Sequence, residues 1–583
     1  MKKTKIVCTV GPSTDRVGLL GELLLAGMDV ARFNFSHGSH DDHARRLGLV
    51  RQAEAQVQKV VATMADTRGP EIRLGLFEQG SVVLEEGASF TLTTEQVLGN
   101  AQRAQVSYTG LPQEVSRGTK ILLADGLLAL EVESVTGSEI YTRVIHGGQV
   151  SDRKRVACPG LELQLPFLSP QDEKDLHFAL EQHMDYVAAS FVQKAEDVLA
   201  IRRIIEQHGA RMGIIAKIEN AAGVKHLDEI LNVADGIMVA RGDLGVEIPY
   251  EYVPLVQKRI IAACNKAGKP VITATQMLES MMHSYRATRA EASDVANSIL
   301  DGTDAIMLSG ETASGEYPLQ AVQTMAKIAL RTEASLDYGE LFQRKGLQER
   351  IHATEAISHA TVQIAQEIRA DAILTITETG LTARMLAKYR PQAKIIAVVS
   401  QAAQLRLLQL YWGVQPVLGP TSASTDEMIE LSLGTALEQQ LLEQGASVVV
   451  TAGAPVGKPG STNLIKVVTV ANKLVCGVGI GKKIVTGRVC KALKSVDFVE
   501  KLQPGAILVV DVLNDEDVAL AAKKSAAIIA EEGGLTSSTA IVGISCGLPV
   551  VVGAHQALER LEDGQLVTVD TISGIVYEGA IDL

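Results

Sequence analysis

The chain has 583 residues, a formal net charge of −13 and 21% charged residues. This length exceeds what one hydrophobic core accommodates, so we expect three or four domains. The acidic balance argues against a general binder of nucleic acid or of anionic membranes, which need a basic surface. No apolar run reaches the roughly 20 residues that span a bilayer, and the amino-terminal run is too short for a signal peptide. The six cysteines form no CxxC pair, so neither a disulfide framework nor a zinc site is indicated. We expect a cytoplasmic protein.

Short apolar runs rich in β-branched residues recur through the first half of the chain. They lack polar alternation, which is typical of parallel strands covered on both faces. Helical stretches such as 195–209 and 253–268 separate most of them. Eight such runs predict an α/β fold built on a (β/α)8 TIM barrel. The runs lie at 5–11, 29–36, 59–67, 185–192, 212–220, 236–244, 269–277 and 304–312.

These runs end on residues that a hydrophobic core would reject. They include Arg32, Asn34, Asp66, Thr67, Ser190, Lys217, Glu219, Arg241, Asp243, Thr275, Gln276, Ser309 and Glu311. In a TIM barrel the carboxyl ends of the strands form the active site. For any one residue, capping a helix or starting a loop explains the polarity equally well. Because the pattern recurs from strand to strand, it favours a site at the mouth of the barrel.

One interval between the ends of the predicted barrel strands is much longer than the others. Asp66 and Ser190 are 124 residues apart, about 100 more than the usual step between strand ends. The excess holds short alternating strands with glycine turns, which predict a small β-barrel or sandwich, and its position makes it a candidate lid. We therefore expect the barrel over 1–67 and 167–344 and an inserted β domain over 68–166.

Two further domains are expected after the barrel. Strands and helices alternate over 345–474, which predicts a separate α/β domain. The last segment, 475–583, has its own apolar strands and the glycine-rich turn "EEGGLTSSTA". We expect it to form an additional α/β domain.

Glu219 and Asp243 end consecutive strands of the predicted barrel, so their carboxylates should converge. Without histidine or cysteine partners they suit Mg²⁺ or Mn²⁺, which also take substrate oxygens as ligands. The cations expected nearby are Arg32, Lys217, Arg241 and Arg73. This combination predicts a polyanionic substrate bridged by metal, and a lysine suits a transferring phosphoryl group. A structural ion pair between Lys217 and Glu219, two apart on one strand, remains an alternative interpretation.

Six motifs, in this order, resemble the pyruvate kinase family. They are "GPSTDRVGLLGELLLAGMDVARFNFSHG", "DTRGPEIRLG", "IAKIENAAGV", "GIMVARGDLGVEI", "ITATQMLESM" and "TRAEASDVANSILDGTDAIMLSGETASGEYP". The resemblance extends to about residue 474. It implies transfer of the phosphoryl group of phosphoenolpyruvate to ADP, giving pyruvate and ATP in the final step of glycolysis, by an allosterically regulated enzyme.

The resemblance also implies roles for individual residues. Arg32 would contact the transferring phosphoryl group, and Lys217 would stabilise its charge. Glu219 and Asp243 would hold Mg²⁺ or Mn²⁺. The substrate carboxylate would lie against the backbone of Ala240, Arg241 and Gly242, beside Asp243 and the hydroxyl of Thr275, which also lies near the site of enolate protonation. The K⁺ ligands would be Asn34, Ser36, Asp66 and Thr67, and the nucleotide-contacting positions Asn34, Phe35, Ser36, His37, Arg73 and Lys154.

Three departures from the family pattern stand out. Arg68 replaces a lysine in "DTRGPE", "RVACPG" (155–160) replaces a GVNLPG segment, and a proline that commonly precedes "TRAE" is missing. We expect none of them to touch the metal ligands, Lys217 or the carboxylate cradle. A metal-dependent barrel lyase or aldolase acting on pyruvate or phosphoenolpyruvate, and a catalytically inactive binding protein, are the rival hypotheses. Pyruvate formation that depends on ADP would distinguish them.

A regulatory site is expected in the α/β domain. Thr377, Thr379, Gly380 and Thr382 surround a strand-to-helix turn, where hydroxyls and backbone N–H groups can hold a phosphate. In the family this loop binds the phosphate of an allosteric effector; an ordinary helix cap is the alternative. Because the loop 455–463 adds only Lys458 as a cation, we favour a sugar monophosphate such as ribose 5-phosphate, or AMP. The family also implies a homotetramer.

The last segment resembles a second family. "EEGGLTSSTAIVGISCGLPVVVG" (531–553) is similar to the swivelling phosphohistidine domain of phosphoenolpyruvate-utilising enzymes, whose motif reads TSHAA. Ser538 stands where that motif has its histidine, and an unactivated hydroxyl cannot replace a nucleophilic imidazole. We therefore expect a structural or regulatory module that carries no phosphate.

Overall fold

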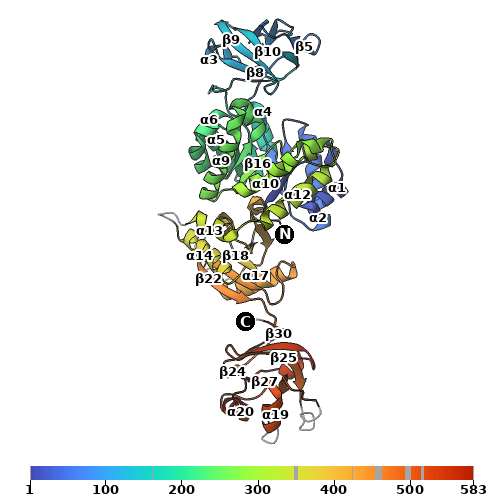
Figure 1. Cartoon of the computed structure of the whole chain (residues 1–583), viewed down its shortest axis with the longest axis vertical. Coiled ribbons are helices and arrows are strands. Elements are labelled where there is room, and N and C mark those ends of the chain that lie inside the picture. The colour runs from blue at the N-terminus through green and yellow to red at the C-terminus, as the bar shows by residue number, and fades with distance from the viewer. Residues whose placement is uncertain are drawn as a thin grey trace. The chain divides into compact units, whose positions relative to one another are not determined.

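The computed structural model describes residues 2–161, 163–346, 352–422, 424–453, 462–492, 501–513 and 518–581. The chain forms two compact units, whose elements are labelled in Figure 1. One comprises Met1–Val362, Thr375–Thr421 and Ala452–Asn463; the other comprises Gln363–Leu374, Ser422–Thr451 and Leu464–Leu583. Within the described residues, no helix combines the length and the apolar character needed to cross a membrane.

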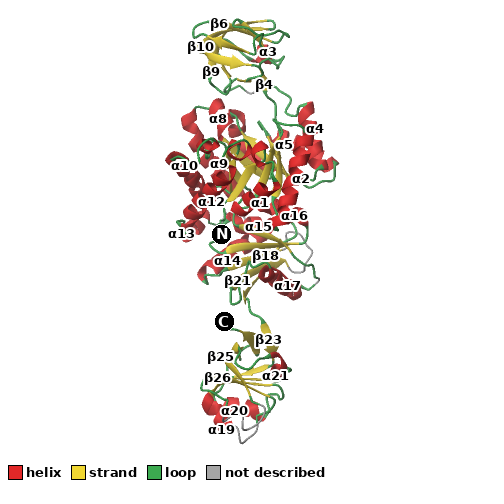
Figure 2. Cartoon of the chain, turned by 90° about the vertical axis from the view of Figure 1, so that its right-hand side faces the viewer, coloured by secondary structure: helices red, strands yellow, loops and turns green. Residues whose placement is uncertain are grey.

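A closed barrel of eight parallel strands forms the centre of the first unit. This confirms the (β/α)8 architecture expected from the sequence. The strands are β1 (Lys5–Thr9), β2 (Val30–Asn34), β3 (Ala62–Asp66), β13 (Tyr186–Ala189), β14 (Gly213–Ile218), β15 (Gly236–Ala240), β16 (Val271–Ala274) and β17 (Ala305–Leu308). In Figure 2 these strands lie inside a ring of helices.

Several helices around the barrel begin at side-chain caps that the sequence provides. The Ser39 hydroxyl accepts from the Asp42 N–H, and the Thr288 hydroxyl accepts from the Glu291 N–H. The helices are α1 (Val17–Ala26), α2 (His40–Val57), α4 (Pro170–Glu181), α5 (Ala195–Gln207), α6 (Ala221–Lys225), α7 (Leu227–Val233), α8 (Arg241–Glu247), α9 (Val253–Ala267), α10 (Arg289–Asp301), α11 (Gly310–Ala313), α12 (Pro318–Ala334) and α13 (Tyr338–Lys345).

Strand periodicity decides which polar residues reach the mouth of the barrel. Met238 fills the barrel interior, whereas its neighbours Ile237 and Val239 pack outward with the surrounding helices. Successive side chains of a strand point to opposite faces, so a residue two positions after an interior residue also points inward. The interior residues Val30, Met64, Ala188 and Ile215 are followed in this way by Arg32, Asp66, Ser190 and Lys217. These four polar side chains therefore form the next layer up, at the carboxyl end.

The segment between β3 and β13 forms a separate β structure with its own core, which includes Phe90, Leu92, Leu130 and Ile140. Its strands alternate buried and exposed residues, as the sequence predicts. A seven-stranded sheet has the order β4 (Ile72–Arg73), β12 (Arg155–Ala157), β8 (Lys120–Leu123), β9 (Leu128–Thr136), β10 (Glu139–His146), β6 (Ser89–Thr93) and β7 (Arg103–Gln105). A second sheet pairs β11 (Gly148–Ser151) with β5 (Ser81–Leu84), and α3 (Leu111–Glu114) is the helix of this segment.

A five-stranded sheet follows the barrel in the chain. Its order is β20 (Val414–Leu418), β19 (Lys394–Val399), β18 (Ala372–Ile376), β21 (Ser447–Gly453) and β22 (Thr462–Thr469). The associated helices are α14 (Ala353–Glu367), α15 (Leu381–Lys388), α16 (Ala402–Leu407) and α17 (Thr425–Glu438). The sequence did not predict β20, which contains Pro416; proline is tolerated here because β20 is an edge strand of the sheet.

The last part of the chain has an eight-stranded sheet with buried residues on both faces. In β26 (Ala506–Val510), Leu508 and Ile507 belong to different core clusters, one on each side. The order is β23 (Lys473–Cys476), β30 (Ile575–Glu578), β29 (Leu566–Asp570), β25 (Ile484–Lys491), β26, β27 (Ser525–Ala530), β28 (Val550–Val552) and β24 (Val478–Ile480). Among the described residues of this part, the helices are α19 (Val518–Lys524), α20 (Ser538–Cys546) and α21 (Ala557–Arg560).

Candidate active site

Lys217 lies at the centre of a buried polar cluster at the mouth of the barrel. Its Nζ is 3.0 Å from Asp66 Oδ1 and donates to Ser190 Oγ over 2.7 Å. Arg32 donates from Nε to Asp66 Oδ2 at 2.6 Å and from Nη1 to the Thr9 hydroxyl at 2.8 Å. Because these residues come from β1, β2, β3, β14 and the position just after β13, the tertiary structure holds both cations in fixed positions.

Electrostatics keeps this cluster ionised although it is buried. Burial disfavours the charged form of Lys217, but the carboxylates of Asp66 and Glu219 outweigh it and raise the lysine pKa. Burial also opposes ionisation of Asp66, yet Arg32 and Lys217 hold the pKa of its carboxyl below the ordinary value. The Lys217 ammonium and the Asp66 carboxylate are therefore both charged, and the ammonium lies at the mouth of the barrel, where it can contact an anionic ligand.

Glu219 is a buried carboxylate at the mouth of the barrel, and its two oxygens have different partners. It is 1% exposed, and its Oε2 accepts the Phe191 N–H at 2.6 Å. Its Oε1 receives no hydrogen bond, although Lys217 Nζ lies 2.9 Å away. The structural ion pair considered from the sequence is thus present, but it is one contact within a larger cluster. Burial, together with the nearby Asp243 carboxylate, raises the pKa of Glu219 against the opposing effect of Lys217.

The residues fit a divalent ion that takes only part of its coordination from the protein. Glu219 offers a buried oxygen without a hydrogen bond, and Asp243 in the first turn of α8 has a partly exposed side chain, at 34%. In the parts of the chain that the structure describes, no group of three or more histidines, cysteines and carboxylates is placed to bind a metal. Mg²⁺ and Mn²⁺ suit such a pair, since water and substrate oxygens complete their coordination.

The proposed carboxylate cradle is formed by the start of α8 and the turn after β16. The Gly242 N–H donates to the Thr275 hydroxyl at 2.8 Å, and that hydroxyl donates to the Ala274 carbonyl at 2.6 Å. Thr275 and Gln276 have φ of 64° and 54°, a left-handed conformation that is uncommon for non-glycine residues and is often found at functional sites.

The Arg241 side chain points away from the cluster. Its guanidinium lies 2.7 Å from Asp294 and 2.7 Å from the Thr275 carbonyl oxygen. Arg241 was expected as one of the cations near Glu219 and Asp243, and the structure shows its guanidinium held by these two acceptors. Its guanidinium instead supports the turn that carries Thr275.

The four residues matched to K⁺ ligands lie at the ends of neighbouring strands. Asn34 of β2 is the register partner of Asp66 of β3, and the Asn34 side chain accepts the Ser36 N–H at 3.1 Å. The Thr67 hydroxyl accepts the Ser190 N–H at 3.1 Å. Parallel pairing of β2 with β3 thus brings the four residues to one side of the mouth.

The nucleotide-matched positions divide by exposure. The side chain of Phe35 is buried against His43 and Phe178, so any ligand contact there uses its backbone. His37 and Lys154 are exposed. Arg73 is also exposed, and its Nε donates to Glu71 at 2.9 Å.

Two polar residues in this region were not assigned a role from the sequence. Ser190 links Lys217 to the Thr67 carbonyl, to which it donates at 2.6 Å; its position at a strand end was the available signal. Arg155 of β12 forms an ion pair with Asp243. The expectation that the "RVACPG" departure touches no candidate metal ligand is therefore wrong, because Arg155 is the first residue of that segment.

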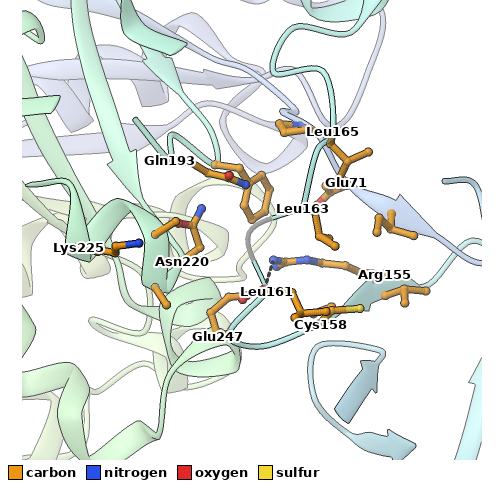
Figure 3. Close-up of a pocket in the computed structure, with 18 residues that line it drawn as sticks. Glu71, Arg155, Cys158, Leu161, Leu163, Leu165, Gln193, Asn220, Lys225 and Glu247 are labelled. Atoms are coloured by element: carbon orange, nitrogen blue, oxygen red, sulfur yellow. Dashed lines mark ion pairs between the residues drawn. The ribbon is translucent and has the colours of Figure 1, made fainter. Parts of the chain in front are cut away.

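Arg155 also lines a cavity of about 240 Å³ beside the mouth. Figure 3 shows its side chain pointing into the cavity, toward Glu247, with Asn220, Lys225 and Glu71 around the same space.

Glu311, another polar residue at a strand end, has a structural role. Its carboxylate accepts the N–H groups of Leu278 and Ser309, so the helix-capping interpretation holds for it.

The candidate effector turn is compact. Gly380 has φ of 77°, and a Cβ there would lie 2.5 Å from the Gln404 side-chain nitrogen, so glycine is required. The Thr377 hydroxyl accepts the Gly380 N–H at 3.1 Å, and the Thr382 hydroxyl hydrogen-bonds Thr462 at 2.6 Å. Thr379 is exposed. Lys458 lies outside the described residues.

A (β/α)8 barrel with buried cations and carboxylates at the carboxyl ends of its strands defines an enzyme that acts on an anionic substrate. The chain matches the pyruvate kinase barrel domain over residues 1–322 and the pyruvate kinase alpha/beta domain over 355–468. It also matches the mobile domain of PEP-utilising enzymes over 502–574. The chain belongs to the pyruvate kinase family.

Individual relatives agree with this assignment over the full length. The chain is 49% identical to a pyruvate kinase of Geobacillus stearothermophilus and 47% identical to one of Sporosarcina psychrophila, with 99% of each chain covered in both comparisons. A crystal structure of a pyruvate kinase from Cryptosporidium parvum matches with a TM-score of 0.77 and 41% identity. That match covers 80% of this chain and 96% of the other.

Proposed function

We propose that this chain is a pyruvate kinase that transfers the phosphoryl group of phosphoenolpyruvate to ADP, giving pyruvate and ATP. The observation that carries the proposal is the Lys217 cluster: a buried, charged lysine fixed by Asp66 and Ser190 beside Arg32. In phosphoryl transfer, catalysis is mostly positioning and electrostatic stabilisation. A preorganised ammonium suits this task because it need not reorient as the charge moves.

Each side chain has a distinct part in this proposal. Arg32, with Nε and Nη1 held by Asp66 and Thr9, directs its remaining nitrogen at the phosphoryl group. The backbone N–H groups at the start of α8 receive the substrate carboxylate, and Thr275 orients it. Glu219 and Asp243 would hold Mg²⁺ or Mn²⁺, which as a bound Lewis acid neutralises charge on substrate oxygens.

K⁺ is the proposed monovalent cofactor, held by Asn34, Ser36, Asp66 and Thr67. Support comes from the register pairing of Asn34 with Asp66, which gathers oxygen ligands next to the cluster. ADP would contact the segment 34–37 and the exposed Arg73 and Lys154. The proposed phosphate effector, a sugar monophosphate such as ribose 5-phosphate, or AMP, would lie at the turn around Gly380, where Thr379 is exposed.

The assembly and cell location follow the family. We infer a cytoplasmic homotetramer that binds small anionic molecules and neither nucleic acid nor membranes. We also infer the domain bounds from the sequence: barrel 1–67 and 167–344, lid 68–166, α/β domain 345–474 and additional domain 475–583.

The additional domain is proposed to carry no phosphate. Ser538, the first residue of α20, is exposed, but Ser537 caps the helix by accepting the Ala540 N–H at 3.2 Å. The buried Thr539 hydroxyl accepts the Leu513 N–H. The hydroxyls of Ser537 and Thr539 have structural partners, and Ser538 at the matched position has no imidazole. Both facts support a structural or regulatory role.

A coupled assay of pyruvate formation tests the catalytic proposal. ADP, Mg²⁺ and K⁺ are omitted in turn, with ionic strength kept constant. We expect each omission to abolish or strongly reduce the rate. Pyruvate formation without ADP would instead support the lyase or aldolase alternative, and no reaction with all components present would support a binding protein.

A further inference from the structure

Arg155 connects the inserted β structure to the proposed cation site. It is the first residue of β12, and its Nη1 donates to Asp243 Oδ1. Its Nη2 lies 3.8 Å from Glu247 Oε1, and its guanidinium carbon lies 4.5 Å from the centre of the Phe191 ring. The side chain is only 9% exposed and points into the cavity of Figure 3. It is therefore held on several sides at the mouth of the barrel.

The charge of Arg155 is permanent. Burial opposes it, but Asp243, followed by Glu219, Glu71 and Glu247, outweighs burial and raises the pKa of the guanidinium. Arginine does not lose its proton in proteins in any case. The carboxylate of Asp243 thus already has a cation as its partner.

A divalent cation and Arg155 compete for the same carboxylate. One oxygen of Asp243 is taken by the guanidinium, and two positive centres on one carboxylate repel each other strongly when partly buried. Arg155 is the first residue of the segment "RVACPG", which departs from the GVNLPG pattern that the family resemblance implies. The competition therefore depends on a side chain of this segment.

We propose that Arg155 is a latch on the divalent-cation site: it holds Asp243 when no cation is bound and must leave that carboxylate when a cation binds. Arg155 is a positioning residue, because it acts through Asp243. By thermodynamic linkage, the factor by which Arg155 weakens cation binding equals the factor by which the cation weakens the Arg155–Asp243 contact. The contact of β12 with the barrel mouth is therefore coupled to cation loading. The inference rests on the proposed role of Asp243 as a cation ligand.

Direct titration with Mn²⁺ tests the latch without turnover. Free Mn²⁺ is measured by electron paramagnetic resonance in the full-length wild type, in Arg155→Gln and in Arg143→Gln, with no substrate present. Arg143 is a matched control, since it lies in the same inserted segment and pairs with Glu133 at 2.6 Å. We expect Arg155→Gln to bind Mn²⁺ at least about fivefold more tightly than wild type, the lower end of typical coupling. Arg143→Gln should bind as wild type does, and Arg155→Lys should remain closer to wild type than Arg155→Gln.

Equal or weaker Mn²⁺ binding by folded Arg155→Gln overturns the proposal and leaves the contact as a structural ion pair. If that variant does not fold, a crystal structure of the Mn²⁺-bound wild type decides: Arg155 beyond hydrogen-bond distance of Asp243 supports the latch, and an intact contact overturns it. Asp243→Asn distinguishes a failure of the proposed cation site from a failure of the latch. If this variant binds Mn²⁺ as tightly as wild type, the proposed cation site itself fails; if it loses binding while Arg155→Gln changes nothing, only the latch fails.

Discussion

Replacement of Lys217 by methionine is the sharpest test of the catalytic assignment. The substitution keeps the length and apolar stem of the side chain and removes the ammonium that lies 3.0 Å from Asp66 Oδ1 and 2.9 Å from Glu219 Oε1. Arg32 still pairs with Asp66, so the pocket retains one fixed cation. The change therefore removes one charge from the cluster.

The expected effect on kcat is large. Loss of one preorganised electrostatic group at a reacting centre costs about 3 kcal/mol, or roughly 100-fold to 1,000-fold in kcat. Because charge grows on the phosphoryl group only during transfer, the loss should appear in kcat, with KM for phosphoenolpyruvate changed by less than about threefold. Breaking a buried ion pair also costs about 3 kcal/mol of stability.

Steady-state kinetics of pyruvate formation, together with thermal unfolding, measures both effects. Lys5→Met is the control: Lys5 is a buried lysine at the amino end of β1, where its Nζ donates to the Val414 carbonyl at 2.7 Å. It should lower Tm and leave kcat near wild type, because it lies at the opposite end of the barrel strands. A folded Lys217→Met enzyme with nearly normal kcat and a raised KM would refute the role assigned to Lys217.

Three further changes test other parts of the chain. Glu71→Lys should reduce the K⁺ requirement, because an ammonium at this position supplies the charge that K⁺ otherwise brings; wild-type activity that is unchanged in K⁺-free buffer of matched ionic strength would contradict this. Deletion of 475–583 should retain the kinase reaction while altering Tm or the response to an effector; a folded, inactive truncation, or stable labelling of the segment by radioactive phosphoenolpyruvate, would contradict the proposed role. Asp29→Asn should lower Tm at neutral pH. Burial opposes ionisation of Asp29, but Lys2 and Lys5 depress its pKa in the folded state. The carboxylate therefore stabilises the fold at pH values above the pKa of aspartate in the unfolded chain, about 3.9. This stabilisation is lost as the pH falls through the lower pKa of the folded state. The difference in Tm from wild type should therefore shrink on acidification toward pH ~3 in thermal melts, and a constant difference would show that the charge is irrelevant.

Some features of the fold follow from local pattern alone. The eight apolar runs predicted eight barrel strands, because burial on both faces requires continuous apolar residues. Period-two alternation then orients Lys217 and Asp66 into the barrel along with Ile215 and Met64. In contrast, Pro416 obscured β20, whose place at the edge of its sheet depends on how the other strands pair.

The sequence by itself determined the barrel, the inserted β segment and the polar residues at the strand ends, because each depends on patterns within a few residues. Only the tertiary structure decided which partners these side chains take. Arg241 contacts Asp294, 53 positions away in the chain, and Arg155 contacts Asp243, 88 positions away. Such contacts depend on side-chain rotamers and on packing between separate elements, which local periodicity does not encode. Arg155 is therefore the partner of Asp243 because the tertiary structure places β12 beside the mouth of the barrel.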